Sequence, residues 1–292
     1  MNVRVLNSVL FIVLFVLLIS AQPVAAEDPS TASAQNGPTA KPDEQAQALE
    51  PAAGEKQIAE DAKADQDVKN EDPSSPEELF ALAMKYETGK GEKKDLREAA
   101  RLYTLSAEQG HMQAQYKIGL MNEEGAGLVR NYKQAVKWYG MAAEQGHILA
   151  QSNLARLYYD GQNVAQDYKL ASLLARSAAK QDDLDSQILL AKMYHYGNGM
   201  PQDYKRAAFW YRKAAQKGSD YAQYSLAIMY LYGRGVTRNP QEAYAWANLS
   251  AAQGYYEADD LREEIARSLT QQELAKAQNI SKMYYKKYVE PF

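Results

Sequence analysis

The most suggestive catalytic motif is Ser177-Ala178-Ala179-Lys180, which has the S-x-x-K spacing of serine acyl enzymes. Those enzymes also need an S-D-N and a K-T-G element, whereas this chain has Ser219-Asp220-Tyr221 and no K-T-G. The motif by itself therefore does not indicate an enzyme. It leaves a cell-wall or β-lactam hydrolase as the least favoured function.

Three further groups of residues could bind a phosphate or a metal ion. Gly89-Lys90-Gly91 lacks the G-x-x-x-x-G-K-[ST] spacing of a phosphate-binding loop. The aspartates within residues 182–185 lack the glycine and glutamate of a calcium-binding loop. His111 and His147 lie 36 residues apart, and an internal repeat explains that spacing better than a metal site does. We therefore expect no catalytic residue, no metal and no cofactor.

The composition favours binding over chemistry. The 292 residues contain no cysteine, which excludes disulfides and thiolate metal sites, and only three histidines. Residues 27–76 carry 12 acidic and four basic residues, whereas residues 77–292 carry 25 acidic and 28 basic residues, a net charge of +3. A nucleic-acid groove needs a concentrated basic stripe, so nucleic acid is not an expected partner.

Residues 1–26 have the features of a secretory signal peptide. Arg4 gives a positive start, an unbroken run of eleven apolar residues extends from Val9 to Ile19, and small residues end at Ala26. An uncleaved membrane anchor is the competing interpretation, but spanning a bilayer takes about 20 apolar residues. We expect cleavage after Ala26, no stable membrane insertion afterwards, and a periplasmic or secreted protein.

A segment rich in Ala, Pro, Glu, Asp, Gln and Lys occupies residues 27–74. Such a segment cannot bury enough apolar surface to offset the entropy lost on ordering. We expect it to be a disordered acidic linker. The folded part is expected at residues 75–256, followed by a closing segment at 257–292.

Residues 75–256 contain five units of 36 residues that align without an insertion or deletion. One glycine position and one Asp/Asn position recur in every unit. The glycines are Gly89, Gly125, Gly161, Gly197 and Gly233, and the Asp/Asn residues are Asp95, Asn131, Asp167, Asp203 and Asn239. Self-similarity at such a period is typical of solenoid proteins.

Each unit is expected to form two helices joined by a tight turn. In the second unit Ala114, Ile118 and Asn122 share one helical face, Gly125 suits a left-handed C-cap, and Asn131 can cap the second helix. Three residues after the cap, units one, two and five carry a side chain that predicts a reciprocal capping box, namely Glu98, Gln134 and Glu242. Departures from the repeat at Asn122, Asn163 and Asp182 predict slight irregularity in units two and three.

A large apolar residue recurs at one position of each helix and is expected in the core. The first helices carry Leu82, Ile118, Leu154, Leu190 and Leu226, and the second helices carry Leu102, Trp138, Leu174, Trp210 and Trp246. Ser75-Pro76 predicts the first helix start. Thr270 and Glu273 predict a capping box that opens a closing helix, which a stack of repeats needs to cover its apolar end.

The repeat pattern resembles the Sel-1-like repeat family, which is related to tetratricopeptide repeats. Unit four shows the resemblance best, in Tyr194-His195-Tyr196-Gly197-Asn198-Gly199 and Trp210-Tyr211-Arg212-Lys213-Ala214-Ala215. The resemblance implies an all-α fold: a right-handed α/α solenoid of five 36-residue helix-turn-helix repeats with a C-terminal capping helix pair. It also implies adaptor and scaffold roles, in bacteria often in the cell envelope, without naming a ligand.

Repeats of this kind resemble tetratricopeptide arrays, whose first helices line a concave groove. Helical angles place positions 116, 117, 120, 123 and 124 of unit two, and their equivalents, away from the core. These positions become apolar and aromatic toward the C-terminus, which favours a partner surface. The expected patch consists of Tyr196, Tyr224, Ile228, Leu231 and Tyr232, with Ile188 and Lys192 beside it. The alternative is that some of these residues are buried between adjacent repeats.

The favoured function is an exported, non-catalytic scaffold or adaptor. It would bind a protein or peptide in the groove of the solenoid and serve in cell-envelope regulation or assembly. The alternative is a secreted protein that binds a host or extracellular protein.

Overall fold

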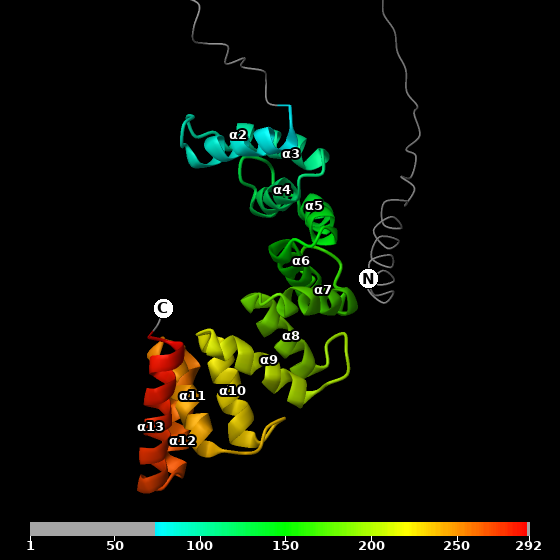
Figure 1. The fold of residues 1–292 in the computed structure, drawn as a ribbon. Helices are drawn as coiled ribbons and strands as arrows, with labels where there is room; N and C mark the ends of the chain where they lie inside the picture. The colour runs from blue at the N-terminus through cyan, green and yellow to red at the C-terminus, as the bar shows by residue number, and fades with distance from the viewer. Residues whose placement is uncertain (1–73, 291–292) are drawn as a thin grey trace, which may run out of the picture. The chain divides into compact units, whose positions relative to one another are not determined.

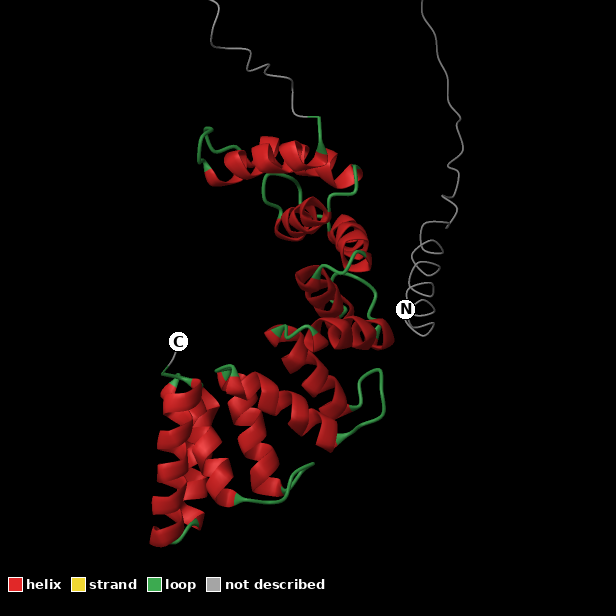
Figure 2. Ribbon diagram, in the orientation of Figure 1, coloured by secondary structure: helices red, strands yellow, loops and turns green. Residues whose placement is uncertain are grey.

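The computed structural model describes residues 74–290, which form twelve helices and contain no strand (Figures 1 and 2). The proposed signal peptide and all of the proposed linker except Ser74 lie outside the described residues. No helix within residues 74–290 combines the length and the apolar character needed to cross a membrane.

Ten of the described helices form five pairs, and each of these ten has 13 residues. The first helices are α2 (Pro76–Thr88), α4 (Met112–Glu124), α6 (Ile148–Asp160), α8 (Leu184–Tyr196) and α10 (Asp220–Tyr232). The second helices are α3 (Leu96–Glu108), α5 (Tyr132–Glu144), α7 (Tyr168–Lys180), α9 (Tyr204–Gln216) and α11 (Pro240–Ala252). From α2 to α11 each helix packs against the next one along the chain, and the two closing helices, α12 (Tyr256–Ser268) and α13 (Gln271–Tyr288), both pack on α11 (Figure 1). The expected α/α solenoid with a C-terminal capping pair is confirmed.

The helix boundaries follow the repeated cap residues. Each first helix ends at a glycine in the left-handed conformation, as at Gly125 with φ 78°. Each second helix begins at an Asp or Asn whose side chain accepts a backbone N–H of the first turn, as Asn131 does from Gln134 at 3.1 Å. Such a cap contributes about 1 kcal/mol to helix stability. The 36-residue period therefore fixes where ten helices start and stop.

The reciprocal capping boxes predicted in units one, two and five do not form at Glu98, Gln134 and Glu242. In these units the N–H of the N-cap residue already donates to a carbonyl near the end of the first helix, at 2.8–3.0 Å. With that donor occupied, Glu98 accepts from Arg101 and Glu242 accepts from Tyr284 instead. The box predicted at Thr270 does form, as does a second one at Ser75.

Most of the expected core positions are buried. On the first helices these are Ile118, Leu154, Leu190 and Leu226, and on the second helices Leu102, Trp138, Leu174 and Trp246. Leu82 is only half-buried, because among the described residues no unit precedes α2. Trp210 is also half-buried, with the Lys213 ammonium 5.5 Å from its ring centroid.

The three departures from the repeat have different effects. Asp182 keeps the left-handed conformation of the glycine that it replaces, with φ 73°, and is the single non-glycine residue with positive φ among those described. Asn163 does not take the left-handed conformation of its equivalent Gly127. Asn122 is buried within α4, where its amide donates to the Ile118 carbonyl at 2.7 Å. The expected irregularity is thus confined to the turn at Asn163.

Candidate partner-binding surface

The positions expected to face a partner lie on the first helices, and we name them the first-helix face: positions 116, 117, 120, 123 and 124 of α4 and their equivalents in α6, α8 and α10. Ile188, Lys192 and Tyr196 lie on α8, and the other four residues of the expected patch lie on α10. Tyr196 and Tyr232 are 60% and 58% exposed. The remaining members are half-buried, and the apolar ones pack against the core: Ile188, Tyr224, Ile228 and Leu231.

The aromatic side chains of α10 pack against aromatic rings of neighbouring elements and against cations. The Tyr224 ring lies 5.0 Å from that of Tyr255, and the Lys192 ammonium lies 4.2 Å from the Tyr221 ring centroid. The Arg234 guanidinium lies 5.5 Å from the Tyr232 ring. These contacts hold part of the patch in place, whereas the faces of Tyr196 and Tyr232 stay largely open to solvent.

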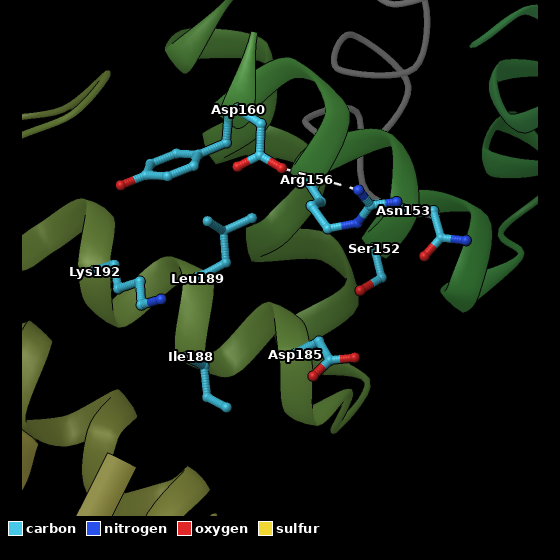
Figure 3. Close-up of a pocket in the computed structure, with 9 residues that line it drawn as sticks. Ser152, Asn153, Arg156, Asp160, Asp185, Ile188, Leu189 and Lys192 are labelled. Carbon is cyan, nitrogen blue, oxygen red and sulfur yellow. Dashed lines mark ion pairs between the residues drawn. The ribbon is translucent and has the colours of Figure 1, made fainter. Parts of the chain in front are cut away.

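A cavity of about 380 Å³ opens between α6 and α8 on the first-helix face (Figure 3). Ile188 and Lys192 line it, whereas Tyr196 and the α10 residues do not. Its other lining residues are Ser152, Asn153, Arg156, Tyr159, Asp160, Asp185 and Leu189. The sequence prediction selected apolar and aromatic residues of the face and therefore did not include this cavity. The charged and polar residues at the equivalent positions of unit three are the feature of the sequence that could have indicated it.

The Glu123 carboxylate of the first-helix face, and that of its equivalent Glu87 on α2, are paired within the chain. Glu87 accepts from the Tyr103 hydroxyl at 2.5 Å and from the Lys117 ammonium at 2.9 Å. Burial opposes ionisation of Glu87, but these two donors outweigh it and lower the pKa of its carboxyl. Glu123 repeats the arrangement one unit later, accepting from Tyr139 at 2.8 Å and pairing with Arg156.

The two histidines at equivalent positions cap helices. The Nδ1 of His111 accepts the Ala114 N–H at 3.1 Å, and the Nδ1 of His147 accepts the Ala150 N–H at 3.2 Å. Their rings stack on the preceding unit, with His147 4.4 Å from the Tyr116 ring. Burial lowers the pKa of His147, which favours the neutral ring that a cap requires.

The S-x-x-K motif and the aspartates of residues 182–185 lie on the helices and turns of the repeat. Ser177 is half-buried on α7 and Lys180 is exposed at the end of that helix. The aspartates of the 182–185 cluster serve separately, since Asp183 caps α8 and Asp182 pairs with Lys217 at 2.8 Å. Among the described residues, no group of three or more His, Cys, Asp or Glu side chains could hold a metal ion.

Comparison with solved structures gives relatives of the same architecture. The chain is 32% identical to a protective antigen of uropathogenic Escherichia coli that displays an SLR fold, with a TM-score of 0.67, over 75% of this chain and 47% of that one. It therefore spans about half the length of that protein. It is 30% identical to a Sel1 repeat protein from Oxalobacter formigenes, with a TM-score of 0.60, over 72% of this chain and 85% of that one. No curated protein matches significantly.

The family model of the Sel1 repeat matches five successive segments, which cover more than half of the chain: residues 79–111, 113–147, 148–183, 184–219 and 220–255. These segments follow the five helix pairs α2–α3 to α10–α11. Sel1 repeat proteins are generally scaffolds for protein interaction. By its repeats, its helices and its solved relatives, the chain belongs to the Sel1 repeat family.

Proposed function

We propose that the protein is an exported, non-catalytic scaffold that binds a protein or peptide along the first-helix face of α8 and α10. The observation that carries this proposal is the exposure of Tyr196 and Tyr232, at equivalent positions of successive units, within a fold that serves protein interaction. Tyrosine offers a large, rigid and amphipathic surface, and it is enriched in protein interfaces. The half-buried residues Ile188, Tyr224, Ile228 and Leu231 would form the floor of that surface.

Site-specific crosslinking tests the surface directly. A photoreactive phenylalanine analogue placed at position 196 or 232 should crosslink to one defined partner in intact cells. The same analogue at Phe209, which is 49% exposed on the second helix α9, is the matched control and should give no such product. Equal products from all three positions, or products at 209 alone, would contradict the proposed surface.

Export and a role in envelope regulation or assembly are part of the proposal and are supported by the composition of residues 1–26. Cell fractionation should recover the protein outside the cytoplasm, and N-terminal sequencing of that fraction should begin at Glu27. A protein that retains Met1 and sediments with membranes would favour the uncleaved anchor instead.

A second candidate is a secreted protein that binds a host protein. Its supporting observation is the 32% identity to a protective antigen of uropathogenic Escherichia coli, although this chain spans about half of that protein. The two candidates differ in location. Recovery of the mature protein from the culture medium favours the second, and retention in the periplasm favours the first.

A further inference from the structure

One ion pair joins a cation on α6 to a carboxylate of the unit before it. Arg156 on α6 forms an ion pair with Glu123 on α4, which precedes it by 33 residues. Lys192 on α8 is the next equivalent of Arg156, but the residue 33 positions before it is Tyr159. Among the described residues, no carboxylate lies within ion-pair distance of Lys192. This lysine therefore occupies the position equivalent to the paired Arg156, with Tyr159 at the position equivalent to the Glu123 acid.

The surroundings of Lys192 hold it ready for an anion. Its ammonium lies 4.2 Å from the Tyr221 ring centroid, and its side chain is half-buried. The Tyr159 hydroxyl accepts from the Asn198 amide at 3.2 Å, which fixes the residue that replaces the acid. An ammonium in such a partly apolar setting gains more from a carboxylate than a fully solvated one does.

The cavity between α6 and α8 lies where the missing acid would be, because both Tyr159 and Lys192 line it. The other cation of the lining, Arg156, is occupied by Glu123 and lies 3.9 Å from Asp160. Figure 3 shows Lys192 and Asp185 at opposite sides of the cavity, with the apolar side chains of Ile188 and Leu189 between them. Lys192, which has no carboxylate within ion-pair distance in residues 74–290, thus lines the same cavity as the apolar side chains of Ile188 and Leu189.

We propose that this cavity binds an Asp or Glu side chain of a peptide partner, with Lys192 as its counter-ion and the neighbouring apolar atoms on Ile188 and Leu189. The inference rests on the proposed function, and it specifies the partner chemistry: an extended segment with a carboxylate beside an apolar residue. Asp185 and Asp160 also line the cavity and repel a second carboxylate, so one acidic residue is recognised at this site.

The test uses three pools of nonapeptides, amidated at the C-terminus so that no terminal carboxylate competes. The central residue is fixed as Glu, Gln or Lys, and the other positions are mixtures of uncharged residues. The immobilised protein should retain the Glu pool about five- to tenfold better than the Gln pool, as a partly buried charge pair provides. Lys192→Met should abolish that preference. Lys213→Met removes the same charge from a lysine over Trp210 on α9 and should leave it unchanged.

Two further variants distinguish a binding role from a structural one. Tyr159→Glu restores the acid of the register, and the variant should lose the preference for the Glu pool while its helical circular dichroism stays unchanged. Lys192→Glu should reverse the preference in favour of the Lys pool. A preference that survives both Lys192→Met and Tyr159→Glu would overturn the proposal.

The outcomes also separate this inference from the proposed function. Equal retention of the Glu and Gln pools, lost in the Tyr196→Ala/Tyr232→Ala variant, would overturn the carboxylate site and support the first-helix face. Preference for the Glu pool without crosslinks at positions 196 and 232 would support the carboxylate site and overturn the proposed surface around Tyr196 and Tyr232. Retention of no pool would overturn the carboxylate site, and the crosslinks would still report on the proposed function independently.

Discussion

Replacing Gly127 by alanine should lower the free energy of unfolding more than replacing Gly110 does. The difference measures the cost of a steric clash between two units, apart from the cost of a left-handed alanine. Gly127 has φ 74°, and a Cβ there would lie 2.1 Å from the Leu96 carbonyl oxygen, at the start of the preceding unit's second helix. Gly199 repeats this geometry at 2.2 Å from the Tyr168 carbonyl oxygen. Gly110 also has positive φ, 91°, but no atom lies within 4 Å of its added Cβ. The pair Gly127 and Gly110 therefore differ mainly in contact.

The magnitudes follow from this geometry. An alanine in the left-handed conformation costs about 1–2 kcal/mol at either position. At Gly127 the Cβ would also lie about 1 Å inside the ordinary C···O contact of about 3.3 Å. The Leu96 carbonyl oxygen belongs to the backbone of α3 and cannot move aside by a change of rotamer, so the two units must separate. Such overpacking costs about 1–3 kcal/mol more. We expect total losses of about 2–5 kcal/mol for Gly127→Ala and about 1–2 kcal/mol for Gly110→Ala.

Urea unfolding followed by circular dichroism at 222 nm measures both free energies of unfolding under the same conditions. Gly199→Ala should behave like Gly127→Ala and serves as an internal repeat of the experiment. Equal losses for Gly127→Ala and Gly110→Ala would refute the reasoning, because the backbone conformation alone would then account for the cost. A larger loss at Gly110 would refute it more strongly.

Lowering the pH should destabilise the fold, because His147 caps α6 as a neutral ring and burial lowers its pKa. The unfolded chain then takes up the proton first, so the free energy of unfolding falls as the pH drops below about 6.5; replacing His147 by asparagine, a good N-cap, should flatten that dependence in urea titrations. Asp182→Gly relieves a left-handed backbone, worth about 1–2 kcal/mol, but it loses the exposed pair with Lys217 and the acceptor 2.9 Å from the buried Gln187 amide, so the thermal midpoint should change little. A midpoint that moves by more than about 4 °C in either direction would contradict this. Tyr139→Phe should cost about 1–2 kcal/mol in urea unfolding, because it removes a donor to the part-buried Glu123 carboxylate, and an unchanged midpoint would show that water replaces the hydroxyl.

The helices could be predicted from the sequence because their boundaries depend on local chemistry. Gly125 ends α4 and Asn131 begins α5, as the repeat indicates. The capping box expected at Glu98 failed because the N–H of Asp95 donates to the Tyr86 carbonyl at 3.0 Å, a tertiary contact that a local motif does not contain. Local sequence motifs therefore predict where a helix begins and ends. They predict less well the hydrogen bonds that join one helix to the next.

The candidate site was less predictable from the sequence, because it also depends on contacts between helices. Helical angles are enough to predict that Tyr196 and Tyr232 leave the core, and both are exposed. They do not reveal that Tyr224 packs on Tyr255, the residue before α12, or that a cavity opens between α6 and α8. Both features arise where side chains of two units meet, so they depend on the stacking as well as on the repeat.

Some positions of the repeat keep the same residue type in every unit, whereas others change from unit to unit. The N-cap position keeps Asp or Asn in all five units, because every second helix needs the same cap. The position of Glu87 changes to Glu123, Tyr159, His195 and Leu231 along the chain. Where it is Glu, it neutralises a cation of the next unit and the face is satisfied within the protein. Where it becomes Tyr159, Lys192 has no carboxylate within ion-pair distance in the part of the chain that the structure describes, and it lies beside Ile188 and Leu189. On the proposal made above, a change at one repeat position turns a self-paired surface into a binding surface without altering the fold.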